Sequence, residues 1–88
     1  MISKQRAAYI AAREGLISIG VVFPLLGSGN PNAQHYNWYA QARTAAMSAY
    51  RATIEAGGSE DAARLNALNA AEEVAGVVLS WADNASGE

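Results

Sequence analysis

The chain has 88 residues and a net charge of −2, which suits one small domain. Alanine supplies twenty of its hydrophobic residues, and because each alanine buries little area, the core is thin for a hydrophobic fraction of 51%. The absence of cysteine excludes disulfide bonds and thiolate metal sites. Small chains of this kind often gain burial by self-association or by docking, so we expect a homo-oligomer or a protein partner.

The small net charge hides two halves of opposite sign. Residues 1–54 carry five cations and one anion, whereas residues 55–88 carry one cation and seven anions. The simplest explanation is that two antiparallel elements attract each other within one subunit. The alternative is that the halves face different partners or build a head-to-tail assembly. Five dispersed cations are too few for a nucleic-acid footprint, so no direct nucleic-acid binding is expected.

One segment bears on localisation. Lys4, Arg6 and Arg13 precede an apolar run over residues 15–26, an arrangement that resembles a signal peptide. Against this interpretation, Glu14 abuts the run and no small-residue cleavage site follows closely. The run is also too short to span a bilayer as a helix. We therefore expect a soluble cytoplasmic protein with no membrane span.

A first helix is expected over about residues 4–23. Its apolar residues recur at intervals of three and four and form one stripe: Tyr9, Ala12, Leu16, Ile19 and Phe23. Gly15 and Gly20 weaken this helix, and Pro24 is expected to end it. A strand over residues 16–23 is the competing prediction, but the chain offers no second strand to satisfy its backbone.

A second helix is expected over about residues 31–56. It is expected to start at Asn30 or Asn32. With Asn30 as the N-cap, Pro31 takes the first helical position, and the glycines at 57 and 58 suit the end. Two stripes follow its length, one mixed and one almost all alanine: Tyr36, Ala40, Arg43, Met47, Tyr50 and Ile54, and Tyr39, Ala42, Ala46, Ala49 and Thr53.

A third helix is expected over about residues 59–83, followed by a frayed tail at 84–88. Its first turn contains Glu60 and Asp61, whose charges suit the positive end of the helix dipole. The two-glycine turn makes an antiparallel hairpin of the last two helices, which the first helix or another subunit must cover. The expected fold is therefore all-α, with residues 1–88 as one three-helix domain, and oligomeric.

Enzymatic signatures are few. His35 is the only histidine, so no histidine metal cluster exists and no second histidine is available for acid–base chemistry. Glu72 and Glu73 are adjacent, point about 100° apart on a helix and are expected on a solvated face. We expect no enzyme activity, no catalytic residue, no metal site and no cofactor.

A candidate anion site lies at the start of the second helix. The glycine-rich segment 27–30 precedes a helix N-terminus, where free N–H groups attract anions, but it lacks the lysine of a P-loop. A turn followed by a helix cap explains the same residues. Asn30, Arg43 and Arg51 form the candidate anion-binding set. The preferred alternative is that both arginines pair with the two adjacent glutamates of the third helix.

Four ring side chains fall within five positions and form the candidate partner-binding set: His35, Tyr36, Trp38 and Tyr39. On a helix, Tyr36 and Trp38 point to nearly opposite sides, so one inner face cannot accept both. Trp38 is then either covered by the first helix or the preceding loop, or exposed at an interface of the kind enriched in tryptophan and tyrosine. The sequence leaves both possibilities open.

In its small size, acidity, lack of cysteine and construction from a few helices, the chain resembles the small proteins that phages encode to block bacterial defence systems. The resemblance covers general character and assigns no residue. It implies a stoichiometric inhibitor or adaptor that binds a protein in the host-cell cytoplasm. The alternatives are sequestration of a small anionic ligand such as a nucleotide at a subunit interface, and a structural role in a helical assembly.

Overall fold

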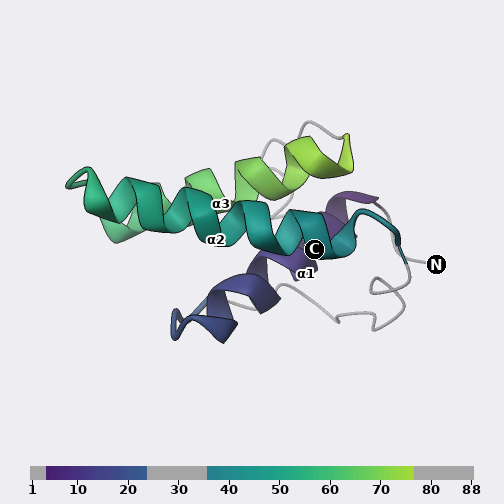
Figure 1. Ribbon diagram of the computed structural model, residues 1–88, viewed down its shortest axis with the longest axis horizontal. Coiled ribbons are helices and arrows are strands. Elements are labelled where there is room, and N and C mark those ends of the chain that lie inside the picture. Colours follow the sequence, from purple (N-terminus) through teal and green to yellow (C-terminus); the bar gives the residue numbers. More distant parts are fainter. Residues whose placement is uncertain (1–3, 24–35, 77–88) are drawn as a thin grey trace.

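The computed structural model describes residues 4–23 and 36–76, which form three helices (Figure 1). Helix α1 spans Lys4–Ser18, α2 spans Tyr39–Glu55 and α3 spans Glu60–Ala75. These residues contain no strand, which confirms the all-α, three-helix prediction and argues against the strand considered for residues 16–23. None of the helices in the described ranges is long and apolar enough to cross a membrane.

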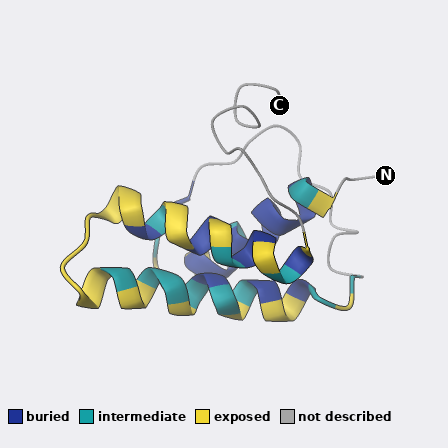
Figure 2. Ribbon diagram, turned by 90° about the horizontal axis from the view of Figure 1, so that it is seen from above, coloured by how far each residue is buried: buried dark blue, intermediate teal, exposed yellow. Residues whose placement is uncertain are grey.

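Helices α2 and α3 lie side by side and are joined by a short loop at residues 56–59, so they run in opposite directions (Figure 1). Helix α1 packs against both of them. The end of the pair that carries the loop extends beyond α1, and its residues are mostly exposed (Figure 2). The core therefore lies toward the other end, where all three helices meet.

Small side chains dominate this core. Of the sixteen apolar residues that are buried in the described part, ten are alanine. On α2 the alanine stripe faces inward, with Ala42 and Ala46 fully buried, whereas Ala40 and Ile54 of the mixed stripe are exposed. Since an alanine face holds a neighbouring helix axis closer than leucine does, these interfaces depend on close backbone approach.

One such close approach joins α1 to α2 at Gly15. A Cβ atom on this glycine would lie 2.8 Å from the backbone oxygen of Arg43 and 3.3 Å from Cγ of Met47. Ser18, one turn further along α1, also contacts α2 and donates a hydrogen bond to Sδ of Met47 at 3.3 Å. Gly15 lowers the intrinsic helix propensity of α1, but its missing side chain is what allows this contact.

A glycine in the left-handed conformation follows each helix. The φ angles of Gly20, Gly57 and Gly76 are 88°, 88° and 77°. After α1, the N–H groups of Gly20 and Val21 donate to the carbonyls of Ile17 and Leu16 at 3.0 and 2.9 Å, the paired bonds of a Schellman motif. The same pair of bonds follows α2, donated by the N–H groups of residues 57 and 58.

These glycines correct two expected boundaries. Helix α1 ends at Ser18 and not near residue 23, because Gly20 turns the chain before Pro24 is reached. Phe23 comes after this turn, and its ring meets that of Tyr9 edge-on at 5.4 Å between centroids. Helix α3 ends at Ala75 and not at 83, because Gly76 caps it. Residues 77–83 of the expected helix, and the tail at 84–88, lie outside the described residues.

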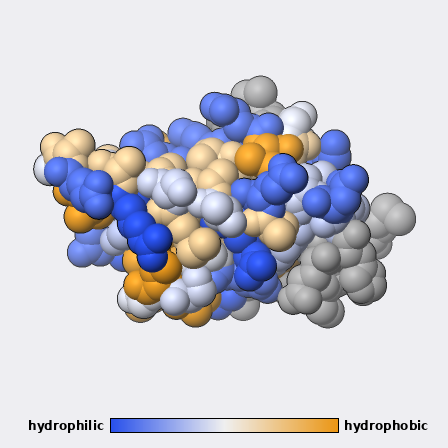
Figure 3. Space-filling view, in the orientation of Figure 1, coloured by the Kyte–Doolittle hydropathy of each residue, from blue (hydrophilic) through white to orange (hydrophobic). Residues whose placement is uncertain are grey.

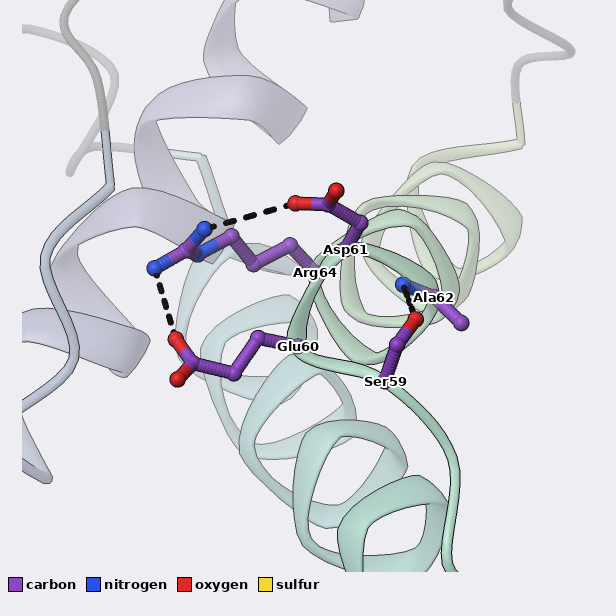
Figure 4. Close-up of polar contacts among 5 residues, drawn as sticks. All are labelled: Ser59, Glu60, Asp61, Ala62 and Arg64. Carbon is purple, nitrogen blue, oxygen red and sulfur yellow. Dashed lines mark hydrogen bonds and ion pairs between the residues drawn. The ribbon is translucent and has the colours of Figure 1, made fainter.

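The start of α3 matches the expectation. The side chain of Ser59 accepts a hydrogen bond from the N–H of Ala62 at 3.1 Å (Figure 4). Arg64 lies near both acids of the first turn, at 3.0 Å from Glu60 and 3.7 Å from Asp61 (Figure 4). Serine capping and acidic residues both suit this end of a helix because its N–H groups lack backbone partners.

The start of α2 differs from the expectation of residue 31. The helix begins at Tyr39, and residues 36–38 form a turn in which the N–H of Tyr39 donates to the carbonyl of Tyr36 at 3.1 Å. Trp38 occupies the N-cap position without a side-chain capping bond. Asn30, Pro31 and the rest of the expected first turns lie outside the described residues.

Replacing Gly15 with alanine tests the contact between α1 and α2. The added Cβ would clash with backbone, which cannot move without separating the helices, so we expect a loss of about 1–3 kcal/mol in unfolding free energy. This loss opposes the gain of about 1 kcal/mol that alanine brings to a helix. Urea unfolding measures the net effect.

Thr44→Ala, at an exposed position of α2, is the control and should leave stability nearly unchanged. A Gly15→Ala protein that is more stable than the wild type would show that the helices are not held this closely.

Candidate functional site

A hollow of about 330 Å³ lies between α1 and the start of α2 and is the candidate site. We call it the α1–α2 hollow. Its lining comes from α1, from the turn before α2 and from the first turns of α2: Glu14, Tyr36, Asn37, Tyr39, Ala40 and Arg43. Helix α1 thus contributes a carboxylate, and the α2 side contributes two phenol rings, an amide and a guanidinium group.

Close packing of the two helices positions the charged groups of this hollow. Gly15 touches the backbone of Arg43, so its neighbour Glu14 is held beside the first turns of α2. Tyr39 and Arg43 are four residues apart and therefore neighbours on one face of α2. The guanidinium carbon of Arg43 lies 6.0 Å from the centre of the Tyr39 ring, at the outer limit of a cation–π contact.

The rings of Tyr36 and Trp38 are stacked, with centroids 5.3 Å apart and planes inclined by 5°. The expectation that these two rings point to opposite sides is therefore wrong. It assumed a helix at 36–38, whereas the turn found there brings alternate residues to the same side. The Tyr39 ring lies 6.4 Å from that of Trp38 and is tilted by 32°, so the three rings form one cluster.

Within this cluster only Tyr39 is buried, at 4% exposure, and it belongs to the hydrophobic core. Tyr36 and Trp38 are half-buried and pack against that core from outside. The question of what covers Trp38 is answered in part by its stacking partner. The tryptophan side chain packs partly against the hydrophobic core, and the rest of it is exposed to solvent.

The Tyr39 hydroxyl is a strongly perturbed titratable group at this hollow. Burial raises its pKa well above the ordinary value, the nearby Glu14 carboxylate raises it further, and Arg43 acts in the opposite direction. The hydroxyl oxygen and Nε of Arg43 are both inaccessible to water and lack a hydrogen-bond partner of good geometry. Tyr39 is therefore kept protonated, as a donor and not as an anionic base.

The structure thus brings together part of each predicted set. Tyr36, Tyr39 and Arg43 line one hollow, and Trp38 adjoins it through the stack. Arg51 lines a different hollow, so the two arginines do not form one anion site. His35 and Asn30 lie outside the described residues.

Two polar lining residues, Glu14 and Asn37, belong to neither predicted set. The signal for Glu14 was present, because it is the only anion among the first 54 residues. Asn37 gave no signal of a binding role, since an asparagine is equally common as an ordinary turn residue.

The preferred pairing of the arginines with the adjacent glutamates of α3 is also wrong. In the described part of the chain, neither Arg43 nor Arg51 makes an ion pair with Glu72 or Glu73. Glu73 is exposed as expected, but Glu72 is only 3% exposed. It lies on the inner face of α3 because Ala71 and Ala75 beside it face the core.

The hollow suits binding by complementary polar groups. Glu14 accepts hydrogen bonds, whereas Arg43 and Asn37 donate them, so a guest with both donors and acceptors is matched. No group of three or more side chains that could hold a metal ion occurs in the described residues. What the arrangement offers chemically is recognition by stacking, hydrogen bonding and charge.

Alkaline titration tests the environment of Tyr39. In the unfolded chain a tyrosine loses its proton near pH 10, but the folded protein retains this proton to higher pH. Above about pH 10 the unfolded state binds fewer protons than the folded state, so stability must fall as pH rises. Tyr39→Phe removes this contribution, and its unfolding free energy should fall less between about pH 9 and 11.

Denaturant unfolding at each pH measures the difference, with Thr44→Ala as a control that keeps the wild-type dependence. Equal slopes for the wild type and Tyr39→Phe would show that the hydroxyl is not buried against Glu14.

Comparisons with known proteins found no relative. No protein-family model, no curated protein and no solved structure matches the chain. No residue therefore receives a role by analogy, and function must be inferred from the geometry of the two helices and the rings between them.

Proposed function

We propose that this chain is a non-enzymatic interaction protein that binds a protein partner stoichiometrically. The binding region is the aromatic surface, which consists of Tyr36, Asn37 and Trp38 together with the α1–α2 hollow. The observation that supports it is the half-buried Tyr36–Trp38 stack beside a polar hollow. Tryptophan, tyrosine and arginine are the residues most enriched at binding hot spots.

Preorganisation supports the same proposal. Stacking fixes the two rings before a partner arrives, and both rest on the core. A partner that covers them loses little side-chain entropy on this side of the interface, because aromatic rings have few rotatable bonds. Rigid rings beside a hollow are a common way to receive a protruding apolar side chain.

The mixed charge of the hollow favours a polypeptide over a free anion. A peptide group carries an N–H donor and a carbonyl acceptor, which match the Glu14 carboxylate and the donors of Arg43 and Asn37. A phosphate meets Arg43 but also the negative charge of Glu14, which repels it. We therefore place a loop or terminal segment of a partner protein in this hollow.

Sequestration of a small anionic ligand such as a nucleotide is the second candidate function. The observation in its favour is the hollow of about 330 Å³ with Arg43 and two tyrosine rings in its lining, which is within the range of small-ligand sites. It ranks second because Arg51 is absent from this lining and Glu14 is present.

An inhibitor of a bacterial defence system, acting in the host-cell cytoplasm, is one specific form of the protein-binding proposal. It draws on the resemblance in general character to small phage inhibitors. Such an inhibitor would bind with a fixed stoichiometry and hide a surface that its target needs, and both properties fit a rigid aromatic surface without requiring catalysis.

Substitutions in the aromatic surface test the main proposal. Trp38→Ala should weaken binding of a captured partner by at least about tenfold, since truncation of a central aromatic residue commonly has effects of this size. Asn37→Arg changes an exposed lining residue that is not part of the core and should weaken binding while stability stays near wild type. The partner is captured from bacterial lysate, and affinities are measured by calorimetry with purified components.

Leu65→Ala is the matched control, because this leucine is 44% exposed and lies on α3 near the opposite end of α2. It should bind like the wild type. A partner that binds Asn37→Arg and Trp38→Ala as tightly as the wild type would place the interface elsewhere.

Tryptophan fluorescence separates the two candidate functions. Trp38 adjoins the hollow, so a bound nucleotide would change its emission. Under the main proposal, nucleoside mono-, di- and triphosphates leave the emission unchanged. A saturable change that Arg43→Ala abolishes would favour the anionic ligand instead. Arg51→Ala is the control, because Arg51 lines the other hollow.

A further inference from the structure

A second hollow lies at the far end of α2 from the aromatic surface. Its volume is about 340 Å³, and its lining comes from the turn after α1 and the last turns of α2: Ile19, Val21, Tyr50, Arg51, Ile54 and Glu55. We call it the C-terminal hollow of α2. Its lining on α2 starts at Tyr50, about 10 Å beyond Arg43 along the helix given a rise of about 1.5 Å per residue, and it shares no residue with the α1–α2 hollow.

Apolar side chains around this hollow are unusually exposed. Ile54 in its lining is 41% exposed, and Val22, which directly follows the lining residue Val21, is 79% exposed. Apolar atoms gather over the turn after α1, at the lower left of the space-filling view (Figure 3). Exposed clusters of this kind on a small protein mark interaction surfaces.

The charges beside the apolar lining indicate what covers it. Arg51 and Glu55 lie one turn apart on α2, are both exposed and make no ion pair with each other in the described structure. A surface that carries one cation and one anion beside an apolar centre is complementary to itself. In a dimer with twofold symmetry, a contact from one residue to a second residue of the other copy is always made twice. Arg51 of each copy can therefore pair with Glu55 of the other copy.

We propose that a second copy of this chain docks on the C-terminal hollow of α2, with the two α2 helices antiparallel across a twofold axis. Ile54 and the valines after α1 form the apolar centre, and two Arg51–Glu55 pairs flank it. A partner of a single charge sign would meet one attraction and one repulsion here, whereas a second copy meets two attractions. This proposal goes beyond the proposed function and uses a surface that the protein partner leaves free.

The test is sedimentation equilibrium of the full chain over a concentration series. The wild type should dimerise. Ile54→Lys places like charges at the centre and should raise the dimer dissociation constant by about tenfold or more. Leu65→Lys, an equally exposed leucine on α3, is the matched control and should dimerise like the wild type. Circular dichroism shows that each variant keeps its helices.

Exchange of the two charges tests the arrangement directly. Arg51→Glu alone and Glu55→Arg alone each set like charges against each other across the axis and should weaken the dimer. The double variant restores opposite charges in a symmetric dimer and should recover wild-type affinity. A different partner would not follow the exchange, so recovery identifies a second copy as the occupant.

Three results would overturn the proposal: a wild type that stays monomeric throughout the series, an Ile54→Lys protein that dimerises normally, or a double variant no better than the single ones. None of these results bears on the aromatic surface, which Trp38→Ala and Asn37→Arg probe separately.

Discussion

The contact of Gly15 with the backbone of Arg43 is the constraint on which the rest of the structure depends. Helices that face each other largely through glycine and alanine gain little from the area of each residue, so they must approach closely to gain dispersion energy along the interface. This approach holds Glu14 opposite Tyr39 and gives the α1–α2 hollow its second wall. The stability of the fold and the shape of the candidate site therefore depend on the same close packing of α1 against α2.

Left-handed glycines set the length of each helix within this frame. Gly20, Gly57 and Gly76 all adopt positive φ angles, which cost little for glycine and much more for other residues. Between α2 and α3, Gly58 adds a requirement for space, because a Cβ there would lie 2.6 Å from Cγ2 of Thr53. The pair is also tied by a hydrogen bond from Asn66 to Thr53 at 2.9 Å. Local signals thus specify where the helices stop, and packing specifies how they meet.

The sequence was sufficient to predict three helices, the two-glycine turn and the acidic first turn of α3. These features are encoded by residues close together in the chain. It was misleading where two local signals competed: Gly20 ended α1 before Pro24 could, and the turn at 36–38 replaced an expected helix. The α1–α2 hollow could not be predicted from the sequence, because Glu14 and Arg43 both line it and are 29 positions apart in the chain. The prediction that Glu72 is exposed was wrong. A charged side chain is normally expected at the surface, but the alanines beside it place this face of α3 against the core.

The α1–α2 hollow has walls on two separate helices, and this links occupancy to folding. A guest that touches both Glu14 and Arg43 binds only while α1 remains docked, so it has no comparable site on the unfolded chain. By mass action, such a guest raises the unfolding free energy in proportion to the logarithm of its free concentration over its dissociation constant. Since small domains are only marginally stable, such an increment is a sizeable fraction of the unfolding free energy. The folded population of this protein would then report the concentration of whatever fills the hollow.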